Sequence, residues 1–403
     1  MTRRSPARNA RLVYGGVTLA SGGIAFYVPL MLSTVGLAHS GAWASGILFG
    51  TNLGRLVGSH FASRHDLFTR RRGAIVANIL LEGVALFSMA FLAAPWMLVA
   101  VATLAGLGSG LSFPGMKNAL LRLAHVDSAR AFAGLSLALR LGMALGYLAG
   151  ALTGAADLRL VFGVLLAMFV GYAAAMDLVL RDIDADPAPS PTPPVAAPAH
   201  AAPDTLAAPA RLDIATLLPM NAVFWFLTIQ PTVTMSLYVP RYVPGLAVST
   251  SYWVTTVTVL ALQMRVTRRA RGPAGHVAFL GVGIACMGAS FVTMAFAGSH
   301  VAPVLAAAVL LALSQVFYAP SLDVLVAADA RVRGQDTGRT MARQLFWQNL
   351  GMMSGSLAAG VLFDAGVRQG LPALCWSAAA GASVLLLAAW ALGVRRAPRP
   401  AAA

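Results

Sequence analysis

Charged side chains are scarce inside the long apolar stretches of this sequence, and the few that occur there are the first candidates for chemistry. Arg140 lies ten residues after Arg130, which on a helix corresponds to about 15 Å along the axis. If the stretch crosses a membrane, a charge at this depth costs about 2.5–3.5 kcal/mol and needs a polar cavity or a partner. We predict that Arg140 binds an anionic group or orients a substrate. The alternative is a structural arginine satisfied by carbonyl groups or by a neighbouring helix.

Two acidic residues lie deep in apolar stretches, where a carboxylate could bind and release a proton. Asp323 is the better candidate, because a carboxylate that is desolvated in one state and paired in another changes its pKa during a cycle. Glu82 is the only glutamate. It could also take up a proton, and pairing with an arginine of a neighbouring loop explains it at least as well.

Lys117 is the only lysine and lies five residues before Arg122, about 7–8 Å from the end of its apolar stretch. Superposing Pro114 on Pro320 superposes Lys117 on Asp323, so opposite charges occupy equivalent depths. This correspondence predicts a gating ion pair near the cytoplasmic end. The alternative is a lysine that extends along apolar surface to the membrane interface.

Other polar residues suggest a binding cavity. Arg55, with Asn52 one turn before it, could line the cavity or bind Asp66. Arg343, four residues past Arg339, suits a cytoplasmic-end gate or a lipid headgroup contact. Aromatic and amide groups that could bind an amphipathic molecule by stacking and hydrogen bonding are Asn221, Trp225, Gln230, Gln344, Gln348 and Asn349. Hydrogen bonding between helices is the alternative explanation for these side chains.

The composition identifies the elements that must position these residues. The chain has 403 residues, of which 58% are hydrophobic and only 11% are charged, whereas soluble domains have about 25% charged residues. We therefore predict an all-α membrane protein, because a membrane helix needs about 20 apolar residues. The twelve expected spans are 12–34, 41–62, 74–93, 96–121, 130–153, 159–181, 213–238, 246–264, 276–297, 301–328, 338–363 and 370–394.

The spans divide into two groups of six. Residues 1–182 form the first group and residues 212–403 the second. Residues 183–211, with eight prolines between 187 and 209, form a solvated linker. Placing both termini in the cytoplasm leaves 22 arginines on that side and three on the other, as the positive-inside rule requires.

The two groups also repeat in sequence. The segment FYVPL at 26–30 returns as LYVPR at 237–241, an offset of 211 residues. Gly142 and Gly146 return as Gly351 and Gly355 at an offset of 209. We therefore predict two pseudo-symmetric six-helix bundles, a known arrangement for transporters with a site between related halves.

With these features the chain resembles the major facilitator superfamily over its whole length. The loop after the second span is similar to a motif of that family through Gly58 and Arg64, with Asp66 as a substitute for its aspartate. The segment GMALGYLAG at 142–150 is similar to the glycine-rich motif of the family's exporters.

The resemblance implies a secondary transporter without cofactor, metal or catalytic residues. We expect export of a small organic molecule, anionic or zwitterionic, by a proton antiporter. It would be a monomer in the inner membrane of a bacterium and would not bind nucleic acid, since the net charge of +15 lies in loops. An importer of an organic anion or sugar, and a membrane scaffold or sensor that transports nothing, remain alternatives.

Overall fold

The computed structural model describes residues 6–65, 68, 71–123, 128–153, 157–185, 214–267, 269, 272–333 and 337–396. Regular secondary structure in these segments is helical. The elements are α1 (Pro6–Ala38), α2 (Gly41–Arg64), α4 (Arg72–Ser88), η1 (Met89–Phe91), α5 (Pro95–Leu123), α6 (Ser128–Thr153), α7 (Leu158–Asp184), α8 (Ile214–Tyr242), α9 (Val248–Thr267), α10 (Gly272–Ala295), α11 (Val301–Val332), α12 (Thr337–Arg368) and α13 (Leu374–Arg396). Each expected span overlaps one of the long helices. Residues 186–211 of the predicted linker, and Asp66, lie outside the described residues.

The apolar composition explains why the chain is helical, since a helix satisfies its backbone hydrogen bonds internally and hydrocarbon offers no other partner. Within the described segments, ten helices are long and apolar enough to cross a membrane. The remaining two long helices, α2 and α9, are more polar. The apolar sequence of α2 is interrupted by Asn52, Arg55 and His60. Serines and threonines recur along the 20 residues of α9. The protein is therefore a multi-pass membrane protein, and the expected count of twelve crossings stays a prediction.

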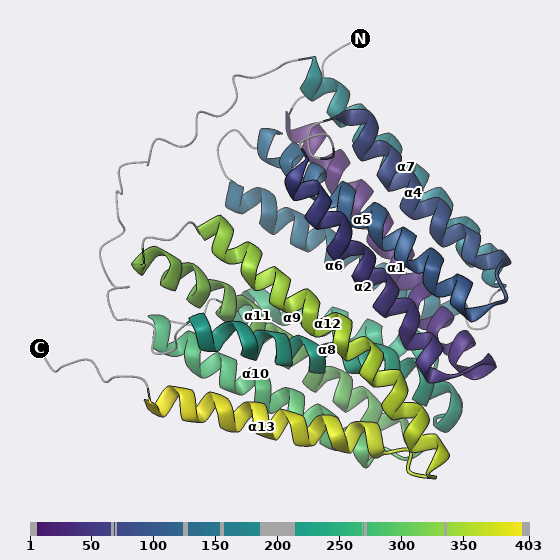
Figure 1. The fold of residues 1–403 in the computed structure, drawn as a ribbon, viewed down its shortest axis with the longest axis vertical. Helices are drawn as coiled ribbons and strands as arrows, with labels where there is room; N and C mark the ends of the chain where they lie inside the picture. The colour runs from purple at the N-terminus through teal and green to yellow at the C-terminus, as the bar shows by residue number, and fades with distance from the viewer. Residues whose placement is uncertain are drawn as a thin grey trace, which may run out of the picture. The chain divides into compact units, whose positions relative to one another are not determined.

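The helices form two compact units. Unit 1 contains α1 up to Met31, α2 from Ile47 onwards, and α4 to α7. Inside it, α4 packs against both α5 and α7 (Figure 1). The core of unit 1 is aromatic and aliphatic, with Ile79, Phe162 and Phe169 fully buried.

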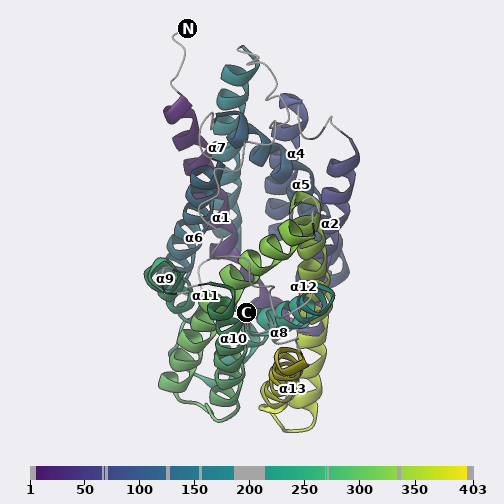
Figure 2. The same cartoon turned by 90° about the vertical axis from the view of Figure 1, so that its left-hand side faces the viewer.

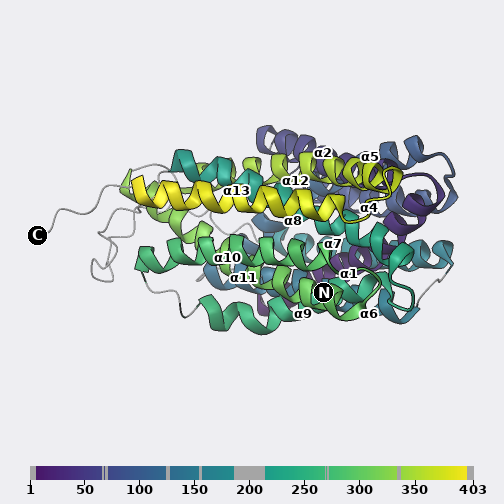
Figure 3. The ribbon, with the colours of Figure 1, turned by 90° about the horizontal axis from the view of Figure 1, so that it is seen from below.

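Unit 2 contains α8 to α13 together with Leu32–Gly46, the corner between α1 and α2. In this unit α12 packs along α8, and α10 packs against α11 (Figure 3). The helix α9 lies beside α11, and α13 lies beside α8 (Figure 2).

The corner is fastened to α12. The carboxylate of Asp364 accepts hydrogen bonds from the backbone N–H groups of Gly41 and Ala42, at 2.7 and 2.8 Å. A Cβ on Gly360 would collide with the carbonyl of Gly41, so the backbones of α2 and α12 are in direct contact here. The start of α2 is thus held by a helix from the other end of the sequence.

Glycines set the closest helix crossing in each unit. Added Cβ atoms on Gly142 and Gly146 of α6 would meet the carbonyls of Thr18 and Gly22 on α1. The corresponding glycines of α12, Gly351 and Gly355, would meet the carbonyls of Ala222 and Phe226 on α8. The partner residues on α1 and α8 are separated by 204 positions at both crossings. The two units therefore repeat the same crossing, as the glycine spacing suggested.

The FYVPL repeat does not share this register. Its offset of 211 residues differs from 204 by seven, which is two helical turns. The small residues that let two backbones approach set the register of the crossing, whereas the aromatic and proline pattern does not.

Candidate functional site

Unit 1 contains a buried polar cluster built around Gly108, Ser109 and Gly110 of α5. A Cβ on Gly108 would lie 2.9 Å from the backbone N of Glu82 on α4. A Cβ on Gly110 would lie 3.0 Å from the Cα of Arg55 on α2. The two glycines therefore allow α5 to fit between the backbones that carry this acid and this base.

Glu82 is the central group of the cluster. Its side chain is buried and hydrogen-bonded to the side chain of Ser109, and its charge interacts with that of Arg55. Two buried tyrosines complete the surroundings, Tyr27 of α1 and Tyr172 of α7, and both interact electrostatically with Glu82. Five helices thus converge on one carboxylate.

The Nε–H group of Arg55 is an unused hydrogen-bond donor in this cluster. Its Nε is buried and finds no hydrogen-bond acceptor among the described residues. The structure therefore brings Arg55 and Glu82 together, a pairing that the sequence did not suggest. Asn52, one turn earlier on α2, is also buried.

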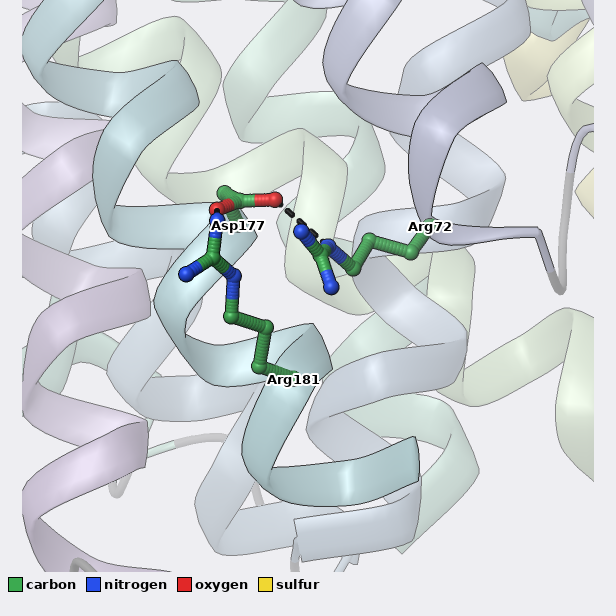
Figure 4. A network of polar contacts seen from close by, with 3 residues as sticks. All are labelled: Arg72, Asp177 and Arg181. Atoms are coloured by element: carbon green, nitrogen blue, oxygen red, sulfur yellow. Dashed lines mark hydrogen bonds and ion pairs between the residues drawn. The ribbon is translucent and has the colours of Figure 1, made fainter. Parts of the chain in front are cut away.

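The loop arginine Arg72 has a different partner. Its Nε lies 2.6 Å from Oδ1 of Asp177 on α7, and Arg181 lies 2.8 Å from the other oxygen of the same carboxylate (Figure 4). This network ties the first turn of α4 to the last turns of α7. The side chains are partly exposed, which suits a structural contact at a membrane interface.

Lys117 and Arg140 are both half-buried in unit 1. The Lys117 ammonium lies over the ring of Phe113, 4.6 Å from its centroid, which is a cation–π contact within its own helix. Arg140 lies on α6 two residues before Gly142, close to the crossing with α1. Lys117 belongs to unit 1 and Asp323 to unit 2, so their pairing stays a prediction.

The loop-motif residues have separate positions. Gly58 is buried inside α2, where an added Cβ would lie 2.6 Å from the carbonyl oxygen of Leu107 on α5. Arg64 is exposed at the end of α2. The backbone contact explains why a glycine occupies position 58.

Unit 2 contains a second polar cluster, which links three helices through Gln344 of α12. Its Nε2 donates a 2.6 Å hydrogen bond to Oδ1 of Asp323 on α11. Its backbone carbonyl accepts a 3.2 Å bond from Nδ2 of Asn221 on α8. The side-chain oxygens of Asn221 and Gln344 are buried and accept no hydrogen bond from the described residues. Two acceptors are thus available beside an exposed carboxylate.

The other candidates in unit 2 divide into two groups. Gln230 is buried and donates its Nε2 to the carbonyl of Gly355 at 3.2 Å, so its donor ties α8 to α12. Trp225, Gln348 and Asn349 are half-buried, and Arg343 is exposed. These four side chains are available to contact a bound molecule.

Sequence reasoning missed the residues that surround Glu82. Tyr27, Tyr172 and Ser109 carry no spacing signal that links them across three helices. A signal did exist in the run GLGSG at 106–110. Gly106 and Gly110 are one turn apart and share a helix face, whereas Gly108 lies on the opposite side, so the helix can approach other backbones closely on two sides. Among the described residues, no group of three His, Cys, Asp or Glu side chains could hold a metal.

Comparison with known proteins identifies the class. The family model of the Major Facilitator Superfamily matches residues 10–335, and the chain belongs to this superfamily. No curated protein matches the chain. The protein is thus a membrane transporter of the Major Facilitator Superfamily.

Solved structures share the fold. The nucleoside transporter NupG superposes with a TM-score of 0.73 at 12% identity, covering 96% of this chain and 99% of its own. An auto-inhibited POT family peptide transporter gives 0.72 at 14% identity, covering 98% of this chain and 99% of its own. The POT family transporter PepTSo gives 0.71 at 14% identity, covering 96% and 98%. Identities this low establish a common fold alone.

Proposed function

We propose that this protein is a proton-driven secondary transporter that exports a small organic molecule through alternating access. The observation that supports the proposal most strongly is the position of Asp323. It is an exposed carboxylate on α11, one of the helices apolar enough to cross a membrane. A charge in such a helix must face water or a polar cavity. Asp323 accepts a hydrogen bond from Gln344. A carboxylate in this position could bind or release a proton when its own access to water changes during the transport cycle.

The substrate is anionic or zwitterionic in this proposal. Basic side chains outnumber acids within the apolar helices, and Arg140 of α6 lies where a negative group would offset its burial. Trp225, Gln348 and Asn349 add an aromatic ring and amides for an amphipathic molecule. Export is favoured by the glycine pattern of α6, whose Gly142 and Gly146 contact α1 closely.

The topology in this proposal has twelve crossings, with both termini in the cytoplasm of a bacterium. The two more polar helices, α2 and α9, cross as helices covered by their neighbours. In unit 1, Gly54 and Gly58 of α2 contact α5. In unit 2, Thr255 of α9 donates a 3.1 Å hydrogen bond to the carbonyl of Ala308 on α11. Such contacts keep the polar groups of these helices away from lipid.

The test compares small molecules inside and outside cells that lack the gene, carry it, or carry Arg140→Ala. Export predicts a compound that accumulates in the deletion strain, is released by the wild-type protein, and is not released by the variant. Arg159→Ala is the matched control, because this arginine is exposed at the start of α7 and should retain transport.

Other outcomes would change the proposal. A compound that stays outside the deletion strain would mean import, and its uptake along a proton gradient would mean symport. Equal compound profiles in all strains, together with an unchanged phenotype for Arg140→Ala, would indicate a scaffold or sensor.

A further inference from the structure

The interior of unit 1 holds an acid and a base that the proposed substrate contacts do not require. Glu82 and Arg55 come from α4 and α2, and both are positioned by the same three residues of α5. Because Gly108 and Gly110 lack side chains, α5 approaches the backbone of α4 at Glu82 and the backbone of α2 at Arg55. The packing of α5 thus positions the backbones that carry Glu82 and Arg55 relative to each other.

Glu82 and Arg55 differ in how well their hydrogen-bonding groups are satisfied. Glu82 has the side chain of Ser109 as a hydrogen-bond partner and the charge of Arg55 nearby. The buried Nε of Arg55 has no acceptor among the described residues. The titratable groups that face Glu82 are Tyr27 from α1 and Tyr172 from α7, both neutral, in addition to Arg55. One positive charge therefore dominates the surroundings of one negative charge.

We propose that Glu82 is a proton-binding site inside unit 1 and that Arg55 is the positioning residue that stabilises its ionised form. The step adds one proton from water to a carboxylate oxygen, and it needs no other reactant. With Glu82 ionised, the charges of Glu82 and Arg55 cancel. With Glu82 protonated, the site has one uncompensated positive charge, which is costly in a buried position.

This change in net charge gives the site a role in transport. The protonated form is favoured in any state where water or an anionic group reaches Arg55, and the ionised form is favoured where Arg55 is closed off. Proton binding in unit 1 is then linked to the conformation of the protein. This link rests on the proposed function, whereas the proton site itself does not.

Infrared spectroscopy of the purified protein tests the site without a substrate. Between acidic and alkaline buffer the wild type should lose the carbonyl band of a buried protonated carboxyl group. In an Asp323→Asn background, which removes the other carboxyl group proposed to exchange protons, Glu82→Gln should lack that titrating band. Asp177→Asn, the matched control in the same unit, should retain it, because Asp177 is partly exposed and paired with Arg72 and Arg181.

Arg55 variants provide the second test and do not depend on Glu82→Gln folding. Arg55→Gln should move the titration of the band to higher pH by about 1–3 units, the range for removing a nearby opposite charge. Arg55→Lys should leave it close to the wild-type position. A titrating band that is absent from the Asp323→Asn protein, one that persists when Glu82→Gln is added to it, or an unshifted band in Arg55→Gln would each overturn the proposal.

Flux measurements separate this inference from the proposed function. A titrating Glu82 in a protein whose flux ignores the proton gradient would keep the site and reject proton-driven export. Flux that follows the proton gradient equally in the wild type and in Glu82→Gln would reject the coupling role of this site and keep the proposed function.

Discussion

Asp364 caps a helix that begins 323 residues earlier in the chain. Its two carboxylate oxygens accept hydrogen bonds from the N–H groups of Gly41 and Ala42. These N–H groups belong to the first turn of α2 and have no intrahelical acceptor. The negative charge also complements the positive end of the helix dipole. A single side chain therefore joins the start of α2 to α12.

Replacing this cap should loosen the corner. Asp364→Ala removes both hydrogen bonds and should lower the free energy of unfolding by about 1–2 kcal/mol, the range for a lost helix cap. Hydrogen–deuterium exchange at the first turn of α2 should accelerate. Asp157→Ala is the control, because Asp157 caps its own helix α7 through the backbone N–H of Arg159. An unchanged exchange rate at α2 in Asp364→Ala would contradict the cap.

Glycine contacts between α2 and α5 should be intolerant of a methyl group. A Cβ on Gly106 would collide with the carbonyl of Thr51, so Gly106→Ala must separate the two helices. We expect a loss of about 1–3 kcal/mol, the usual cost of overpacking. A Cβ on Gly163 meets nothing within 4 Å, so Gly163→Ala should be neutral or stabilising by up to about 1 kcal/mol. Melting temperatures in detergent compare the two, and equal shifts would contradict the contact.

The predicted pair of Lys117 and Asp323 can be tested through coupling. If the two charges interact in one state of the cycle, the effects of Lys117→Ala and Asp323→Ala on the transport rate should not add. A partly exposed pair is worth about 1 kcal/mol, so the coupling should amount to a few-fold in rate. Additive effects of the two substitutions would show that Lys117 acts alone, in keeping with its contact to Phe113.

Ion pairing at the interface end of unit 1 should contribute little and should depend on salt. Asp177→Asn leaves Arg72 and Arg181 side by side without their carboxylate. We expect a loss of about 1 kcal/mol or less, which should shrink as salt is added, because partly exposed charges are screened. A loss that does not change between low and high salt would mean that the network is more shielded than its exposure indicates.

Much of the fold could be predicted from the sequence because membrane helices depend on the composition of a contiguous segment. Each expected span overlaps one helix, and glycine spacing identified the repeated crossing of Gly142 and Gly351. Composition is least able to predict whether a helix crosses the membrane when polar residues lie within it, as Asn52 and Arg55 do in α2. The pentapeptide repeat was a poor guide to register, because side-chain identity matters less at a crossing than the absence of a side chain.

The polar clusters were harder to predict, because each depends on distances between helices that are far apart in sequence. Glu82 and Asp323 stood out as charges in apolar stretches. Arg55 was assigned to a loop carboxylate or a cavity, since nothing in the sequence indicates that α5 brings it beside Glu82. Gln230 was placed in a cavity, and its amide donor is used by the carbonyl of Gly355.

The corner at Leu32–Gly46 has a consequence for how the polypeptide could be divided. Its binding partners Leu237, Gly360 and Asp364 all follow residue 211, whereas the corner itself precedes residue 182. Two separately synthesised fragments, cut within residues 186–211, would each lack part of this contact. The first fragment would present the bare start of α2, and the second would present the carboxylate that caps it. Co-expressed fragments should therefore recognise each other and reassemble without a covalent connection.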